Sequence, residues 1–171
     1  MQMYKRYILI FFLAILLNIL QIGMISSISI FGVSFDLVFV FIVCYSLLRE
    51  DVECVVLALI CGLIRDSFYP EVFGLNTIIY ISAAYILCHI EKKIYKDAVL
   101  IPMISTFIAT IYKGIFYYSL LYAVSIRYNF VGHFLYVVPI EAILNSIVSI
   151  IVFKLVSRIN RLKCMHQEWK F

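Results

Sequence analysis

The sequence predicts an all-α, polytopic membrane protein, a compact bundle of six transmembrane helices in a single domain over residues 1–171. Of the 171 residues, 65% are hydrophobic and only 14% are charged, whereas soluble domains average roughly 45–50% apolar and about 25% charged residues. Mean hydropathy is +1.06, and six crossings of about 20 residues each would use nearly the whole chain. This composition excludes a soluble catalytic or nucleic-acid-binding module.

The uncharged runs mark the expected helices, because the hydrocarbon core penalises charge. The first run lies between Arg6 and Asp36 and predicts a helix over residues 7–28. This run is longer than the hydrophobic region of a secretory signal, about 7–15 residues, and no clear A-x-A cleavage site follows it. We therefore interpret the segment as a retained first transmembrane helix.

The second and third helices are expected over residues 33–48 and 52–68, where the uncharged runs are short. Each of these helices crosses the membrane only if the charges at its ends lie near the interface or inside the protein. The charged residues at 49–53 predict a tight turn between the two helices. Pro70 cannot continue a helix and ends the third one.

A fourth helix is expected over residues 76–90, with Gly74 as an easy turn before it and Asn76 or Thr77 as its N-cap. About 15 residues rise only about 22 Å. The preceding loop is therefore expected to dip below the headgroups, shielded by protein.

The fifth and sixth helices are expected over residues 99–122 and 134–155, each with one charge in its interior. These charges, Lys113 and Glu141, each lie 14 residues from Arg127, so antiparallel packing places them at a similar depth. A charge at membrane depth costs about 2.5–3.5 kcal/mol on insertion scales, and an ion pair between the two is the economical arrangement. The pair would fasten the helices or, alternatively, serve a proton or ion relay. Exchanging the two charges is then expected to restore the accumulation that either reversal alone impairs.

The cations predict the orientation of the bundle. Eleven of the 14 Lys and Arg fall on the side of both termini: Lys5, Arg6, Arg49, Lys92, Lys93, Lys96, Lys154, Arg158, Arg161, Lys163 and Lys170. Both termini, including a short basic tail over residues 156–171, are therefore expected to be cytoplasmic. A five-span alternative, in which the third helix and the loop after it re-enter the membrane, would place the tail outside and violate this distribution.

Polar residues also flank the outer ends of the second and third helices. Asp36 lies where one enters, and Arg65 and Asp66 lie where the other leaves. Ala58, Gly62 and Asp66 are spaced four residues apart, so they share a face that lets another backbone approach closely. Arg65 and Asp66 are alternatively explained by snorkelling and local capping.

Two further polar features belong to the end of the chain. Asn145 follows Glu141 by four residues and shares its face, so it is expected to form hydrogen bonds between helices. A basic stripe suits the anionic cytoplasmic leaflet; it consists of Lys154, Arg158, Arg161 and Lys163.

No catalytic, cofactor or metal site is predicted. The sequence lacks the motifs H-E-x-x-H, G-x-S-x-G and G-x-x-x-x-G-K-[ST]. Its five cysteines form no C-x-x-C pair and are interpreted as small apolar packing residues.

Four short motifs follow one another along the chain: Ser34-Phe35-Asp36-Leu37, Gly62-Leu63-Ile64-Arg65-Asp66, Phe73-Gly74-Leu75-Asn76, and Pro139 with Asn145. A six-span protein of this size with these motifs in this order resembles the rod-shape-determining MreD family. The resemblance implies a non-enzymatic subunit of the cell-elongation machinery in the bacterial cytoplasmic membrane, without cofactors. It also implies partners: the lipid bilayer, an MreC-like bitopic protein and, indirectly, MreB-like filaments and the cell-wall synthases that make peptidoglycan.

The alternative is a substrate-binding S-component of an energy-coupling-factor vitamin transporter, whose six-helix architecture the MreD family is thought to share. Such a subunit would enclose a ligand pocket near the outer face, where Asp36, Arg65, Asp66 and Asn76 would converge. An intramembrane hydrolase or lipid-modifying enzyme is disfavoured, because no nucleophile–base pair is visible at membrane depth.

Overall fold

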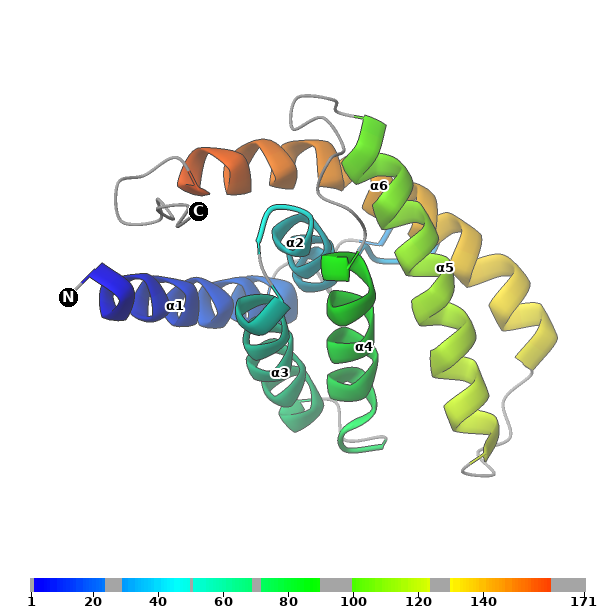
Figure 1. The fold of residues 1–171 in the computed structure, drawn as a ribbon. Coiled ribbons are helices and arrows are strands. Elements are labelled where there is room, and N and C mark those ends of the chain that lie inside the picture. Colours follow the sequence, from blue (N-terminus) through cyan, green and yellow to red (C-terminus); the bar gives the residue numbers. More distant parts are fainter. Residues whose placement is uncertain are drawn as a thin grey trace.

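The computed structural model describes residues 2–23, 29–49, 51–68, 72–89, 100–123 and 130–160. Six α-helices make up this part of the chain (Figure 1): α1 Gln2–Gly23, α2 Leu37–Ser46, α3 Asp51–Phe68, α4 Leu75–His89, α5 Leu100–Ala123 and α6 Phe130–Asn160. Within these ranges β-type pairing is limited to an isolated bridge between Ile30 and Val33. The prediction of an all-α fold with six helices is confirmed.

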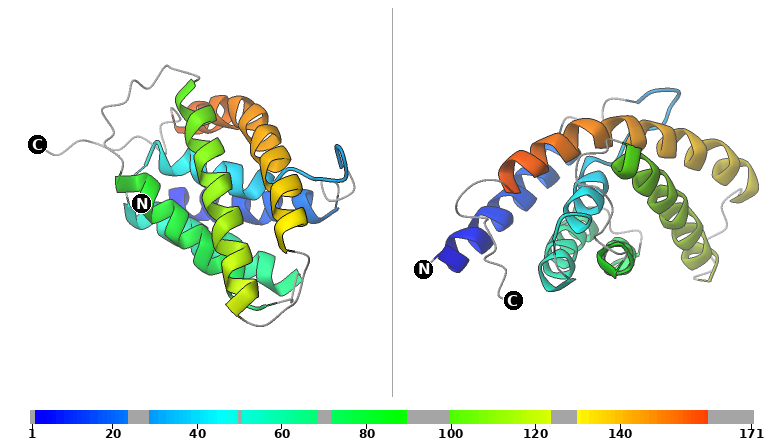
Figure 2. Two further views of the ribbon diagram at one scale, coloured as in Figure 1. Left: turned by 90° about the vertical axis from the view of Figure 1, so that its right-hand side faces the viewer. Right: turned by 45° about the horizontal axis from the view of Figure 1, so that its top comes forward.

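The short helix α2 lies at the centre of the bundle. It contacts each of the other five helices, and its residues from Val38 to Ser46 are all buried. Helices α3 and α4 pack as one pair and α5 and α6 as another, with α1 packed against α3 (Figures 1 and 2). Helix α2 therefore connects the two pairs.

Helix α2 is shorter than the predicted segment 33–48. The residues at 29–36 form a loop, in which Phe31 and Gly32 have positive φ angles of 55° and 77°. Asp36 is the N-cap, and the helix begins at the next residue. Ten residues rise about 15 Å, which is half of the roughly 30 Å hydrocarbon core. The N-cap Asp36 is buried, so α2 starts inside the bundle, and a crossing at this position also needs the residues that flank the helix.

Two helical stretches are long and apolar enough to cross a membrane, by length and composition: Leu100–Ala123 and Phe134–Ile159. Three shorter apolar helices accompany them among the described residues: Ile10–Gly23, Leu37–Ser46 and Leu75–His89. Six crossings therefore stay a prediction, whereas six helices are found in the described residues.

Helix α6 extends past both ends of the predicted segment 134–155. Lys154 and Arg158 are exposed on its last turns, so Arg158 belongs to the helix and not to the tail. Several predictions lie outside the described residues; they concern Glu50, Pro70, the charged segment 91–97, Arg127, Arg161 and Lys163.

Two glycines allow close helix packing. A Cβ added at Gly62 would lie 2.5 Å from Cα of Thr77, so the backbones of α3 and α4 touch at this point. Ala58, one turn earlier on the same face, is fully buried. A Cβ added at Gly114 would lie 2.6 Å from a methyl group of Val138, which brings α5 and α6 together in the same way. The first contact agrees with the predicted small-residue face, whereas nothing in the sequence pattern had singled out Gly114.

Candidate functional site

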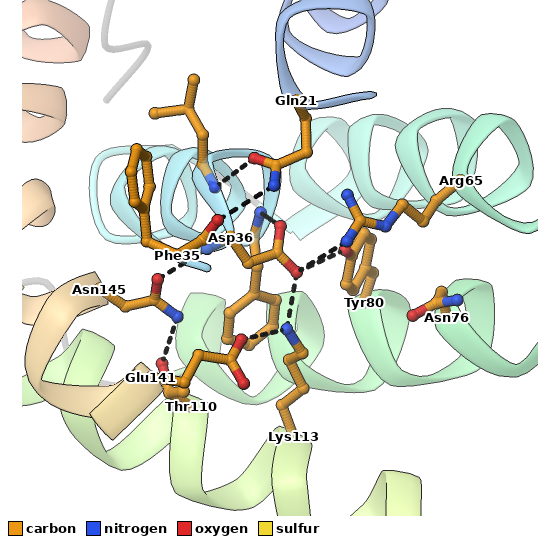
Figure 3. A network of polar contacts seen from close by, with 12 residues as sticks. Gln21, Phe35, Asp36, Arg65, Asn76, Tyr80, Thr110, Lys113, Glu141 and Asn145 are labelled. Atoms are coloured by element: carbon orange, nitrogen blue, oxygen red, sulfur yellow. Dashed lines mark hydrogen bonds and ion pairs between the residues drawn. The ribbon is translucent and has the colours of Figure 1, made fainter. Parts of the chain in front are cut away.

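The carboxylate of Asp36 is the centre of a buried polar network (Figure 3). Its Oδ1 accepts the backbone N–H of Phe39 at 3.1 Å, within its own helix start. Its Oδ2 accepts Lys113 Nζ at 2.6 Å and the hydroxyl of Tyr80 at 3.0 Å. Arg65 Nη2 lies 4.0 Å from the same oxygen. One carboxylate thus joins the start of α2 to α3, α4 and α5.

Lys113 bridges two carboxylates. Its Nζ donates to Glu141 Oε1 at 2.7 Å as well as to Asp36. The pairing of Lys113 with Glu141 that the sequence predicts is therefore present, and Asp36 is a third member that the sequence did not reveal. Gly114 lies next to Lys113 and lets α6 approach closely enough for this contact. With Arg65, the cluster holds two acidic and two basic groups, which is how buried charges are normally compensated.

The backbone on both sides of Asp36 is held by amide side chains. Asn145 is fully buried; its Oδ1 accepts the N–H of Asp36 at 2.8 Å, and its Nδ2 donates to Thr110 Oγ1 at 3.2 Å. Gln21, in α1, donates to the carbonyl of Phe35 at 3.0 Å and accepts the N–H of Leu37 at 2.7 Å. Backbone N–H groups at a helix start have no partner within the helix, and these side chains supply partners from α1 and α6.

Asp66 forms a second, separate node, where it caps α4. Its two carboxylate oxygens accept four hydrogen bonds, from the backbone N–H and the side chain of both Asn76 and Thr77, at 2.6–3.0 Å. Gly74, with a φ of 90°, provides the turn that precedes the helix. Neither Asn76 nor Thr77 is the N-cap that the sequence predicted; both lie in the first turn of α4. The cap comes from α3, because the close contact at Gly62 brings Asp66 to the first turn of α4.

A cavity of about 350 Å³ lies beside the network. Apolar residues and glycines contribute to its lining together with charged and polar ones, namely Ser34, Asp36, Arg65, Asn76, Lys113, Tyr117, Tyr118 and Glu141. The alternative prediction placed Asp36, Arg65, Asp66 and Asn76 around one pocket. Three of these residues do line the cavity, whereas Asp66 is occupied by the cap of α4.

The remaining predicted residues lie elsewhere. Lys154 and Arg158 are exposed near the far end of α6, one turn apart, and the other two members of the basic stripe fall outside the described residues. Cys44, Cys54, Cys61 and Cys88 are free thiols, all buried. Sequence reasoning missed Gln21, Tyr80 and Thr110, because uncharged polar side chains are common in apolar helices.

Large apolar side chains cover the outward faces of α1, α5 and α6. Those more than half exposed include Phe12, Leu16, Ile19, Ile104, Ile108, Ile115, Leu135, Ile143, Ile147 and Ile151. A soluble monomer rarely exposes such continuous apolar surface, so this surface and the interior charges define a helical membrane protein. The chain belongs to the MreD family, because the family model described as rod shape-determining protein MreD matches residues 2–160.

Comparison with curated proteins gives no significant match, and comparison with solved structures gives none either. The likeness to transporter S-components that the sequence suggested is therefore not supported. Family membership supports a role in determining rod shape.

Proposed function

We propose that this protein is a non-enzymatic scaffold of the bacterial cell-elongation machinery in the cytoplasmic membrane. In this role it binds an MreC-like bitopic protein and links MreB-like filaments to peptidoglycan synthesis. Membership of a rod shape-determining family supports the role in cell shape. The observation that carries the proposal is the distribution of polar groups. The charges of Asp36, Arg65, Lys113 and Glu141 gather inside the bundle, whereas the outward faces of three helices are apolar.

The interior network suits a scaffold for a physical reason. Asp36 and Lys113 connect four helices through short, charge-assisted hydrogen bonds, which are about twice as strong as neutral ones. Such bonds fix the positions of the helices relative to one another. The apolar faces are then presented to a partner in one arrangement, which reduces the ordering cost of binding.

Partner capture tests the proposal. Depletion of the protein from a rod-shaped host is expected to produce rounded cells, and the full chain, purified in mild detergent, is expected to bring down an MreC-like protein. Leu16→Asn on α1 and Ile151→Asn on α6 form a matched pair, because both replace exposed apolar residues. If one variant no longer captures the partner but keeps the wild-type unfolding midpoint, the helix that carries the substitution contacts the partner. Unchanged cell shape on depletion, together with no captured MreC-like protein, would overturn the scaffold.

We further propose six crossings with both termini in the cytoplasm. Because the four described cysteines are buried, a membrane-impermeant maleimide added to spheroplasts reports on Cys164. That residue is expected to stay unlabelled until the membrane is permeabilised, with Cys164→Ser as the background control. Labelling of intact spheroplasts would contradict this orientation.

A further inference from the structure

We propose that the 30–33 turn (Ile30, Phe31, Gly32 and Val33) anchors the loop before α2 in the interfacial layer of the bilayer, where the headgroups meet the acyl chains. Figure 2 shows this part of the chain as a blue loop that projects beyond the helices at the edge of the bundle. Phe31 is 76% exposed and Ile30 is 45% exposed. A lipid anchor requires only that the protein lies in a membrane, so it is independent of the scaffold role.

The backbone of the 30–33 turn is strained at its tip. The φ angles of Phe31 and Gly32 are 55° and 77°, and positive φ at both central residues is the feature of a type I′ turn, which prefers the pair Asn-Gly. Phe31 occupies the place of that Asn, although a bulky side chain is unfavourable in the left-handed region. Because Phe31 is exposed, contacts inside the chain offset little of this strain. A phenylalanine at this place is explained by a contact outside the chain.

The main chain of the turn is largely satisfied without water. The N–H of Ile30 donates to the carbonyl of Val33 at 2.9 Å, and the N–H of Val33 donates to the carbonyl of Ile30 at 3.1 Å. The hydroxyl of Tyr136, in α6, donates to the carbonyl of Phe31 at 3.2 Å. Backbone groups in hydrocarbon need partners within the protein. Among the described residues, the N–H of Phe31 and both main-chain groups of Gly32 have none, so the tip needs water or headgroups and belongs at the interface.

The contact with Tyr136 gives the level of the turn along α6. An apolar stretch long enough to cross a membrane runs over Phe134–Ile159, and Tyr136 is its third residue. Helical side chains point back toward the N-terminus of their helix, so the hydroxyl of Tyr136 lies close to the start of this stretch. Tyr and Trp are enriched at that level, at the boundary of membrane and water. Leu135 is 66% exposed and Tyr136 is 54% exposed, so α6 is open to lipid next to the turn.

The composition of the segment favours lipid over water and over a partner recognised by charge. No Asp, Glu, Lys or Arg occurs between Arg6 and Asp36, whereas loops in water are typically polar. The turn offers an aromatic ring and a branched aliphatic chain, side chains that suit the boundary of headgroups and acyl chains. Val33 is buried, and Asp36 follows three residues later as the N-cap of α2. Lipid contact at the turn thus holds the segment that leads into the polar network.

Fluorescence quenching by brominated lipids tests the anchor in the full-length chain. Trp169 is the single tryptophan of the sequence, so Trp169→Phe is a background in which Phe31→Trp introduces the only indole. The protein is placed in phosphatidylcholine vesicles whose acyl chains are brominated either near the headgroup or near the middle of the bilayer. Leu135→Trp and Ile147→Trp serve as depth references, because these exposed residues lie at the start and in the middle of the apolar stretch of α6. The indole at position 31 is expected to lose more emission to bromine near the headgroup, as at position 135, whereas position 147 shows the reverse preference.

A second measurement separates the anchor from the folding of the turn. Phe31→Asn restores the preferred Asn-Gly pair, so this variant is expected to keep at least the wild-type unfolding midpoint. With Ile30→Trp as the reporter, Phe31→Asn is expected to reduce quenching by bromine near the headgroup, whereas Phe12→Asn, at an exposed residue of α1, leaves it unchanged. Quenching of the indole at position 31 by aqueous iodide and by neither brominated lipid would overturn the anchor. So would lipid quenching that disappears when an MreC-like protein is added, because a protein would then occupy the turn.

Discussion

Exchange of the charges at positions 113 and 141 is the sharpest test of the polar network. If Lys113 paired with Glu141 alone, the double variant K113E/E141K would restore the attraction and with it the stability of the wild-type chain. In the structure Lys113 Nζ also lies 2.6 Å from Asp36 Oδ2. The exchange therefore places a glutamate against Asp36, and we expect the double variant to stay destabilised.

The size of the effect follows from the contacts. Two like charges about 4 Å apart repel by about 4 kcal/mol at an effective dielectric constant of 20. Leaving a buried charge without its partner costs a similar amount, about 3–5 kcal/mol. For a chain of this length, each kcal/mol lowers the unfolding midpoint by about 2–4 °C. We therefore expect K113E and K113E/E141K to melt roughly 6–20 °C below the wild-type protein. Glu141→Gln leaves the bond between Lys113 and Asp36 in place, so this variant should lose only about 1.5–3 kcal/mol of stability.

The buried cysteines provide the assay. Cys44, Cys54, Cys61 and Cys88 are buried free thiols, so a thiol-reactive dye becomes fluorescent as the bundle unfolds. Cys164→Ser removes the remaining thiol in every variant. A triple variant, D36N/K113E/E141K, removes the carboxylate that would repel the one introduced at position 113 and keeps a good N-cap residue at the start of α2. It is therefore expected to regain part of the lost midpoint. Full recovery in K113E/E141K without any change at Asp36 would refute the three-membered cluster.

Three more predictions concern helix contacts, each measured with the same thiol assay. Gly62→Ala is expected to lower the midpoint by several degrees, because its Cβ would lie 2.5 Å from Thr77 Cα, while Gly23→Ala, which meets no atom within 4 Å, should have little effect. Asp66→Ala removes the acceptor of four hydrogen bonds at the start of α4 and should cost at least about 2 kcal/mol, with faster hydrogen exchange at the first amides of that helix. A wild-type exchange rate would contradict this capping role. Asn145→Ala leaves the N–H of Asp36 without its partner and should cost about 1–3 kcal/mol; an unchanged midpoint would show that the bond contributes nothing.

More of the fold than of the candidate site can be predicted from the sequence. Uncharged runs predict the helices because the cost of charge in hydrocarbon is large and local. The pair of Lys113 and Glu141 is also predictable, since both lie at equal distance from one turn between antiparallel helices. The place of Asp36 in the network cannot be predicted in this way, because its depth depends on the loop at 29–36 and not on the length of a helix. The residue that caps α4 cannot be predicted from the sequence either. Asp66 lies ten residues before Asn76, and only the packing of α3 on α4 brings them together.

The shortness of α2 explains why the polar groups gather where they do. A helix of ten residues that is buried along its length must begin inside the bundle, where water cannot satisfy its first N–H groups. Asn145, Gln21 and the side chain of Asp36 each accept one backbone N–H at this helix start. Once a carboxylate is used there, its charge needs compensation, and Lys113 supplies it from α5. Arg65 is a second cation near Asp36. Glu141, which pairs with Lys113, adds a second negative charge to the cluster. The network thus follows from a helix that begins inside the bundle, and replacing Asp36 should disturb four helices at once.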